Sequence, residues 1–253
     1  HIPRNEIRQA VAWELQEKFS MRSEDWYFDF NPLDQGAQAN RKDMSVLIAA
    51  IPRNELKLHV QTLKSVGLSP IAVEVKPLPT WELLEDYLHP SDSALLLIEL
   101  GRHHSYVVVV EGLPTFIHTM DFSGDTLTQV IQELLRLEYD QAEAFKLRAG
   151  ITQPSEEISP AGPSEDETQK LNQGRLALRP FAERLAAEIE QAFKYFSFRL
   201  SQQYEIRSFS KILLSGKTSL LKGLKEFLSE RLGVPVEYLE PLGDIMIDEK
   251  VFN

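Results

Sequence analysis

The 253-residue sequence predicts a mixed α/β protein made of two successive units. Several segments carry apolar residues at every third or fourth position, which predicts amphipathic helices. Between them lie short apolar runs bounded by Gly or Pro, which predict strands. Hydrophobic residues make up 43% of the chain and charged residues 26%, a balance typical of soluble domains with a sizeable core. The fold class is therefore α/β.

The charge balance excludes several classes of function. The chain has 38 acidic and 27 basic residues and a formal net charge of −11, which argues against a nucleic-acid surface. No apolar run approaches the roughly 20 residues that a membrane helix needs, so direct membrane insertion is not expected. The sequence contains no Cys and begins without Met or a signal peptide. We expect a cytoplasmic protein and a piece of a longer chain.

Residues 1–76 form the first predicted unit, a small α+β domain. Helix spacing predicts a helix from Pro3 to Phe19 and another from Pro52 to about Val66, where Gly67 ends it. Strands are predicted at the following segments: Trp26–Phe30, Met44–Ile51 and Ile71–Val75. Two nearly identical hexapeptides, Ile2–Ile7 and Ile51–Leu56, open the two helices. We interpret them as independent uses of Pro in a first helical turn, not as a repeat.

Residues 77–253 form the second predicted unit. Its first half is predicted to contain a short helix, a meander of three strands, and two helices, the first of them capped by Asp125 or Thr126. The corresponding segments are Pro79–Tyr87, Ala94–Glu99, Ser105–Glu111, Thr115–Met120, a helix ending near Glu138, and a helix starting at Asp140. Its second half is predicted to contain a long helix over Leu178–Leu200, then strand, helix and strand at Ile212–Leu214, Leu220–Leu232 and Val234–Tyr238.

The segment 153–174 differs in composition from its surroundings. It is rich in Pro, Ser, Glu and Gly and has almost no apolar residues. Such a stretch buries too little surface to offset its ordering entropy. We expect a mobile acidic loop over residues 153–174.

Few residues suggest chemistry on their own. Gly216-Lys217-Thr218 resembles the end of a phosphate-binding P-loop, but Lys211 stands where that motif requires its first glycine. His103 and His104 are adjacent, and we expect solvated turn histidines and no metal site. Asp121, Asp125 and Glu99 are explained as caps and strand ends, because the sequence alone does not show that these carboxylates converge.

The order of motifs in the second unit resembles the PilM family of actin-like type IV pilus assembly proteins. The resemblance rests on the hairpin at Glu99-Leu-Gly101, the helix entry Phe122–Thr128, the segment Gln141–Lys146, the turn Ile212–Gly216 and the closing Leu232–Val236. It implies an actin-like, ribonuclease H-like fold. Residues 1–76 would be the inserted small domain (1C-like) and residues 77–253 the core, mainly subdomains 2A and 2B, with the first part of that core missing. The MshI-type pilus proteins, the GspL cytoplasmic domain of type II secretion and the cell-division protein FtsA are related possibilities.

The resemblance also locates a nucleotide site that this sequence has lost in part. By analogy, Glu99, Gly101, Ser105 and Gly216 are its remnants. Glu99 replaces the family's Asp, bulky residues follow Gly101, and Lys217 replaces the second glycine of a Gly-Gly turn that must lie close to the nucleotide. We therefore expect no enzyme activity, no resident cofactor and little or no binding of Mg-ATP.

The function implied by the resemblance is that of a non-catalytic scaffold. It would hold the cytoplasmic tail of a PilN-like bitopic membrane protein, in a groove between the small domain and the core. It would also contact the assembly motor ATPase and lie at the inner membrane through these partners. The alternative is an ATP-binding actin-like ATPase that drives pilus or secretion assembly. A cell-division adaptor like FtsA is a weaker alternative, because residues Gly243–Asn253 offer no amphipathic membrane helix.

Overall fold

A computed structural model describes residues 3–22, 24–32, 44, 46–82, 95–111, 113–151, 165–200 and 209–240. The chain divides into two compact units, His1–Pro79 and Thr80–Asn253, which are described separately. Within the described ranges, no helix is long and apolar enough to cross a bilayer.

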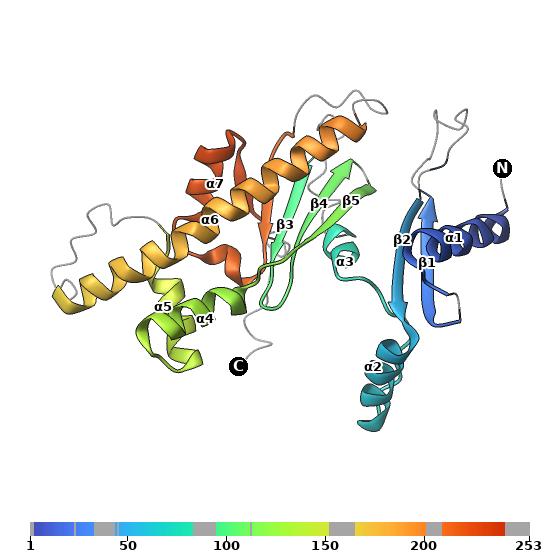
Figure 1. Ribbon diagram of the computed structural model, residues 1–253, viewed down its shortest axis with the longest axis horizontal. Coiled ribbons are helices and arrows are strands. Elements are labelled where there is room, and N and C mark those ends of the chain that lie inside the picture. Colours follow the sequence, from blue (N-terminus) through green and yellow to red (C-terminus); the bar gives the residue numbers. More distant parts are fainter. Residues whose placement is uncertain are drawn as a thin grey trace, which may run out of the picture. The chain divides into compact units, whose positions relative to one another are not determined.

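The first unit is built on a two-stranded antiparallel sheet (Figure 1). Its elements in chain order are helix α1 (Arg4–Phe19), strands β1 (Trp26–Pro32) and β2 (Val46–Pro52), and helix α2 (Arg53–Ser65). Helix α1 packs Val11 and Leu15 against Phe30 of β1 to form a small core. The two similar hexapeptides open α1 and α2, each with Pro as the residue before the helix.

The predicted third strand of this unit is wrong. Residues 68–75 have no regular secondary structure. The apolar side chains of this segment face solvent, and that of Ile71 is fully exposed. An apolar run forms a strand only where a neighbouring strand accepts its backbone hydrogen bonds, and the described residues supply no such neighbour.

The second unit is a five-stranded mixed sheet with helices packed on it (Figure 1). Its strands are β3 (Leu95–Leu100), β4 (Ser105–Glu111), β5 (Leu113–Met120), β6 (Ile212–Ser215) and β7 (Val236–Tyr238), arranged in the order β5-β4-β3-β6-β7. Strand β3 is central and pairs antiparallel with β4 and parallel with β6. All six residues of β3 are buried, as expected for a strand covered on both faces.

Four helices of this unit share one large core with a single face of the sheet: α4 (Gly124–Leu135), α5 (Tyr139–Ala149), α6 (Glu165–Leu200) and α7 (Leu224–Leu232). The short helix α3 (Pro77–Glu82) spans the boundary between the units in the sequence. Leu96 and Ile98 of β3 meet Ile131 of α4, Leu185 of α6 and Leu228 of α7 in this core. The long helix α6 runs along the sheet and the other helices (Figure 1).

Several predicted boundaries in the second unit need correction. The helix predicted from Leu220 begins at Leu224, because Gly223 adopts a left-handed conformation after the short 3-10 helix η2 (Lys217–Leu220). The last strand begins at Val236 and not at Val234. The helix predicted over Pro79–Tyr87 is described only as far as Glu82.

The predicted loop 153–174 is wrong over its second half. Residues 152–164 lie outside the described residues, but helix α6 already begins at Glu165. Its first turn carries Glu165, Asp166 and Glu167, whose negative charges stabilise the partial positive charge of a helix N-terminus. Leu171 then joins the hydrophobic core of the unit. Three of the acidic residues that suggested a loop, Glu165, Asp166 and Glu167, are therefore the first residues of a helix.

Candidate functional site

The candidate site lies where β3 and β6 end side by side. These strands run parallel, with Glu99 opposite Ser215, so the turns that follow them leave the same edge of the sheet. Gly101 begins one turn and Gly216 the other. The carboxyl ends of neighbouring parallel strands are a common place for ligand sites in α/β folds.

Glycine is required at two positions of this edge. Gly216 has a φ of 85°, and a Cβ atom there would lie 2.5 Å from the carbonyl oxygen of Leu100. A Cβ atom on Gly124, the first residue of α4, would overlap the hydroxyl oxygen of Thr218 and lie 3.3 Å from the carbonyl oxygen of Gly101. The backbones of the two turns and of α4 are therefore in direct contact.

Hydrogen bonds hold these three backbones together. The carbonyl oxygen of Gly101 accepts a bond of 2.9 Å from the amide of Gly124 and one of 3.4 Å from the hydroxyl of Thr218. The amide of Asp125 donates to the carbonyl oxygen of Arg102 at 2.8 Å. These hydrogen bonds hold the start of α4 against the β3–β4 turn. The bond from Thr218 holds η2 against the same turn.

Helix α4 is capped by Ser123, and not by Asp125 or Thr126 as predicted. The Ser123 hydroxyl accepts a hydrogen bond of 3.4 Å from the amide of Thr126. Asp125 lies in the first turn of the helix, where its charge is favourable, and its side chain is free to contact other groups.

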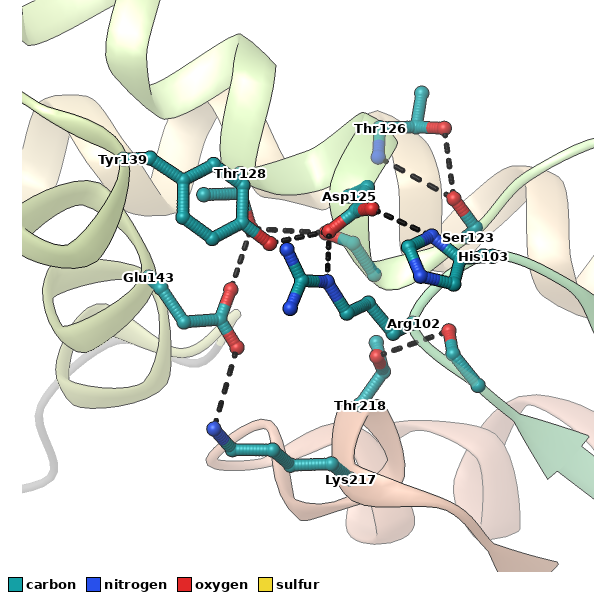
Figure 2. A network of polar contacts seen from close by, with 12 residues as sticks. Arg102, His103, Ser123, Asp125, Thr126, Thr128, Tyr139, Glu143, Lys217 and Thr218 are labelled. Atoms are coloured by element: carbon teal, nitrogen blue, oxygen red, sulfur yellow. Dashed lines mark hydrogen bonds and ion pairs between the residues drawn. The ribbon is translucent and has the colours of Figure 1, made fainter. Parts of the chain in front are cut away.

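Asp125 is the centre of one cluster of polar contacts (Figure 2). It accepts a hydrogen bond of 3.0 Å from Nε of Arg102, one from the Tyr139 hydroxyl, and a contact of 2.8 Å from Nδ1 of His103. Partial burial alone would raise the pKa of Asp125, but the hydrogen bonds from Tyr139 and Arg102 and the charge of Arg102 outweigh it and lower that pKa. His103, predicted to be a solvated turn residue, is exposed and yet bound to this carboxylate.

Glu143 is the centre of a second cluster, on α5 (Figure 2). It pairs with the buried ammonium of Lys146 at 2.6 Å, accepts a hydrogen bond from the Thr128 hydroxyl, and lies 3.9 Å from Nζ of Lys217. Burial would raise the pKa of Glu143, but the hydrogen bonds from Lys146 and Thr128 and the charges of Lys146 and Lys217 lower it below its ordinary value. Both carboxylates of the site are therefore held in their charged form.

Lys146 is one of the most completely buried side chains of the protein, with 1% of its surface exposed. Its ammonium donates to the carbonyl oxygen of Gly124 at 3.0 Å and to the Thr128 hydroxyl at 2.9 Å. With Glu143 as third partner, its hydrogen-bonding capacity is used in full.

The four predicted site residues fall into two pairs. Gly101 and Gly216 lie at the junction of the two turns, as described above. Glu99 is buried in β3 and accepts a hydrogen bond of 3.4 Å from the Thr80 hydroxyl, and Ser105 is buried at the start of β4, opposite Met120. The role of these four residues as remnants of a nucleotide site remains a prediction.

Sequence reasoning missed most of the polar side chains of the site. Tyr139 has no signal of its own in the sequence, and Thr218 appeared only as the last residue of the P-loop-like Gly216-Lys217-Thr218. Glu143 and Lys146 appeared only as part of a motif; their spacing of three on a helix that also buries Ala142 and Phe145 could have predicted an inward-facing ion pair.

The geometry also bears on a P-loop and on a metal site. Lys217 opens a 3-10 helix of four residues, whereas a P-loop leads into a longer helix whose amides cradle phosphate. Among the residues that the structure describes, no three His, Asp or Glu side chains are grouped so that they could hold a metal ion.

Comparison with solved structures identifies the fold as actin-like. The whole chain matches 67% of a chain in a PilM-PilN type IV pilus biogenesis complex, with a TM-score of 0.79 and 24% identity. MreB5 of Spiroplasma citri bound to ADP matches 76% of the chain, with a TM-score of 0.51, 12% identity and 62% of its own length covered. The ethanolamine utilization protein EutJ from Carboxydothermus hydrogenoformans matches 74%, with a TM-score of 0.50, 16% identity and 56% of its own length covered. The chain thus spans between about half and two thirds of the length of these proteins.

Two family models each match more than half of the sequence. The model described as cell division protein FtsA matches residues 96–252. The model described as type IV pilus assembly protein PilM matches residues 2–159, which include the first unit and the β3–β4 turn. A solved structure that covers the whole chain is also that of a PilM complex, which agrees with the PilM model. The chain belongs to the PilM family of actin-like type IV pilus assembly proteins.

Proposed function

We propose that this protein is a non-catalytic scaffold of the inner-membrane platform that assembles type IV pili. It binds the cytoplasmic tail of a PilN-like bitopic membrane protein, and it is held at the cytoplasmic side of the membrane through that partner. The observation that carries this proposal is the match of the whole chain to a PilM-PilN complex. In this proposal, the first unit is the inserted small domain and the second a ribonuclease H-like half of the actin-like core.

The polar network supports the non-catalytic part of the proposal. In related ATP-binding proteins, small residues in the two turns let the main chain approach the nucleotide. Here Arg102 and Lys217 follow Gly101 and Gly216, and their side chains pair with Asp125 and Glu143. A triphosphate entering this site would compete with the Asp125 and Glu143 carboxylates for these two basic side chains, and would be repelled by the negative charges of those carboxylates.

Binding of the tail can be tested with the full chain. A synthetic peptide with the sequence of the cytoplasmic tail of the bitopic protein encoded beside this one would be titrated against it, with a scrambled peptide as control. Saturable binding of the tail peptide alone is expected. Equal binding of both peptides would contradict the proposal.

The unit that contacts the tail can be found by photo-crosslinking. A photoreactive amino acid would replace Trp13 in α1 or Leu176 in α6, whose side chains are 61% and 73% exposed. Crosslinking to the tail from position 13 and not from position 176 would place the tail against the first unit. The opposite result would move the partner surface to the second unit.

Nucleotide binding separates the scaffold from the alternative of an ATP-driven assembly protein. One observation favours the ATP-binding alternative. Gly101 and Gly216 still begin the turns at the carboxyl ends of β3 and β6, and the Glu143–Lys146 ion pair lies close to these turns. Calorimetric titration with Mg-ATP is expected to show no binding. Micromolar binding that Lys217→Ala abolishes would overturn the scaffold proposal.

A further inference from the structure

Positive and negative charges of the site come from different structural elements. Arg102 belongs to the β3–β4 turn and Lys217 to the first position of η2, so both cations follow strands of the sheet. Asp125 belongs to α4 and Glu143 to α5, so both carboxylates come from the helix pair (Figure 2). The Arg102–Asp125 and Lys217–Glu143 pairs each connect the sheet edge to this helix pair.

The two carboxylates are more shielded from solvent than the cations. Their side chains are 22% and 20% exposed, against 64% for Arg102 and 69% for Lys217. Nδ1 of His103 also contacts Asp125, and the ring centroid of Tyr139 on α5 lies 5.0 Å from the Arg102 guanidinium carbon. Partly shielded ion pairs are stronger than fully exposed ones but are still weakened by salt.

Backbone hydrogen bonds join the helix pair to the segments that follow both β3 and β6. The amides at the start of α4 bond to the β3–β4 turn, as described above. Helix α5 is held on α4 through the buried Lys146. The amide of Ile151, just after α5, donates to the carbonyl oxygen of Lys222 at 3.0 Å, and the Glu143 carboxylate lies 3.9 Å from Nζ of Lys217.

We propose that Arg102–Asp125 and Lys217–Glu143 form an ionic clamp that holds the α4–α5 pair against the two turns of the sheet without any bound nucleotide. This inference rests on the proposed function, since a scaffold must keep its shape independently of a nucleotide cycle. The chain's own cations supply ionic contacts between the sheet edge and the helix pair, in addition to the backbone hydrogen bonds. The clamp makes the position of α4 and α5 sensitive to ionic strength.

Hydrogen exchange of the full chain, followed by mass spectrometry, tests the clamp. In the double variant Arg102→Ser/Lys217→Ser, amides of residues 124–149 are expected to exchange about tenfold faster than in the unchanged protein at low salt. Arg231→Ser is the matched control, because Arg231 joins α7 to Glu183 and Glu190 of α6 and lies outside the clamp. It should leave exchange in residues 124–149 unchanged.

A salt titration of the unchanged protein and the double variant gives a second readout. At about 1 M salt the unchanged protein is expected to approach the exchange rate of the double variant, because the Debye length then falls to roughly 3 Å. The double variant itself should respond little to salt. Exchange of residues 124–149 that is unaffected by both substitution and salt would overturn the clamp.

The outcomes separate the clamp from the proposed function. If the tail peptide binds and Mg-ATP does not, but exchange is unchanged, the clamp fails and the scaffold stands. If exchange responds as expected but the unchanged protein binds Mg-ATP, the scaffold fails while the ion pairs still hold the helices.

Discussion

The ammonium of Lys146 in α5 donates a hydrogen bond of 3.0 Å to the carbonyl oxygen of Gly124, the first residue of α4. This bond joins the two helices at the point where α4 leaves the sheet. It is also inaccessible to solvent, since Lys146 is 1% exposed. A cation in such a place is stable only with its full set of partners, which Glu143 and Thr128 complete.

Replacing this lysine should therefore destabilise the second unit. Lys146→Met keeps most of the side-chain volume but removes the charge, and is expected to lower the free energy of unfolding by about 3 kcal/mol. Equilibrium denaturation followed by circular dichroism measures the effect. Lys170→Met, which removes an exposed pair with Asp166 within α6, is the control and should change little. Equal effects of the two substitutions would show that burial of Lys146 does not matter.

Gly216→Ala should disrupt the junction between the two turns. The φ of 85° and ψ of 154° belong to a region that is essentially restricted to glycine, and the new Cβ would collide with the backbone of Leu100. We expect a loss of at least about 2 kcal/mol in the free energy of unfolding.

Gly233→Ala is the matched control for that experiment. Gly233 also has a positive φ, of 65°, but an added Cβ meets no atom within 4 Å. Gly233→Ala should therefore lower the free energy of unfolding by only about 1 kcal/mol, through backbone strain. A Gly216 variant as stable as the Gly233 variant would contradict the close contact with Leu100.

The lowered pKa of Asp125 predicts a dependence of stability on pH. The ordinary value is 3.8, and the folded protein lies below it because hydrogen bonds from Tyr139 and Arg102 outweigh burial. The contribution of the charged carboxylate to stability is thus complete above the ordinary pKa and is lost as the pH falls through the folded pKa. The stability difference between the unchanged protein and Asp125→Asn should therefore be largest near neutral pH and shrink below about pH 4.

Tyr139→Phe provides a directional check of the same prediction. It removes a hydrogen bond that favours the charged carboxylate, so it raises the folded pKa of Asp125 toward its ordinary value. The acid-induced loss of stability should therefore be smaller, and should be complete at a higher pH, than in the unchanged protein. Thermal unfolding at a series of pH values measures it, and a shift to lower pH would contradict the assignment.

The cap of α4 gives a prediction of smaller size. Ser123→Ala removes the acceptor for the Thr126 amide and is expected to cost about 1 kcal/mol of stability. Ser123→Asn restores an acceptor at the same position and should remain within a few tenths of a kcal/mol of the unchanged protein. Thermal unfolding of both variants checks this, and equal losses would argue against a capping role.

The periodicity of the sequence predicted most helices and strands. Helix α1, the strands β1 and β4 and the start of the Gly216 turn depend on local patterns of apolar residues, Pro and Gly, which act over a few positions. Where prediction was wrong, a distant contact decided the outcome. Ile71–Val75 has the composition of a strand but forms no ladder, and residues 165–174 have the composition of a loop but are helical because Leu171 reaches the core.

The sequence by itself determined that bulky basic residues follow Gly101 and Gly216, because residue identity at a motif position is a local property. Only the tertiary structure decided what those residues contact. Arg102 and Asp125 are 23 positions apart in the sequence, and the separation of Lys217 and Glu143 is larger still. No local spacing of residues brings the members of either pair together. They meet because β3 and β6 pair in parallel and α4 begins on the β3–β4 turn, a geometry fixed by backbone hydrogen bonds across the fold.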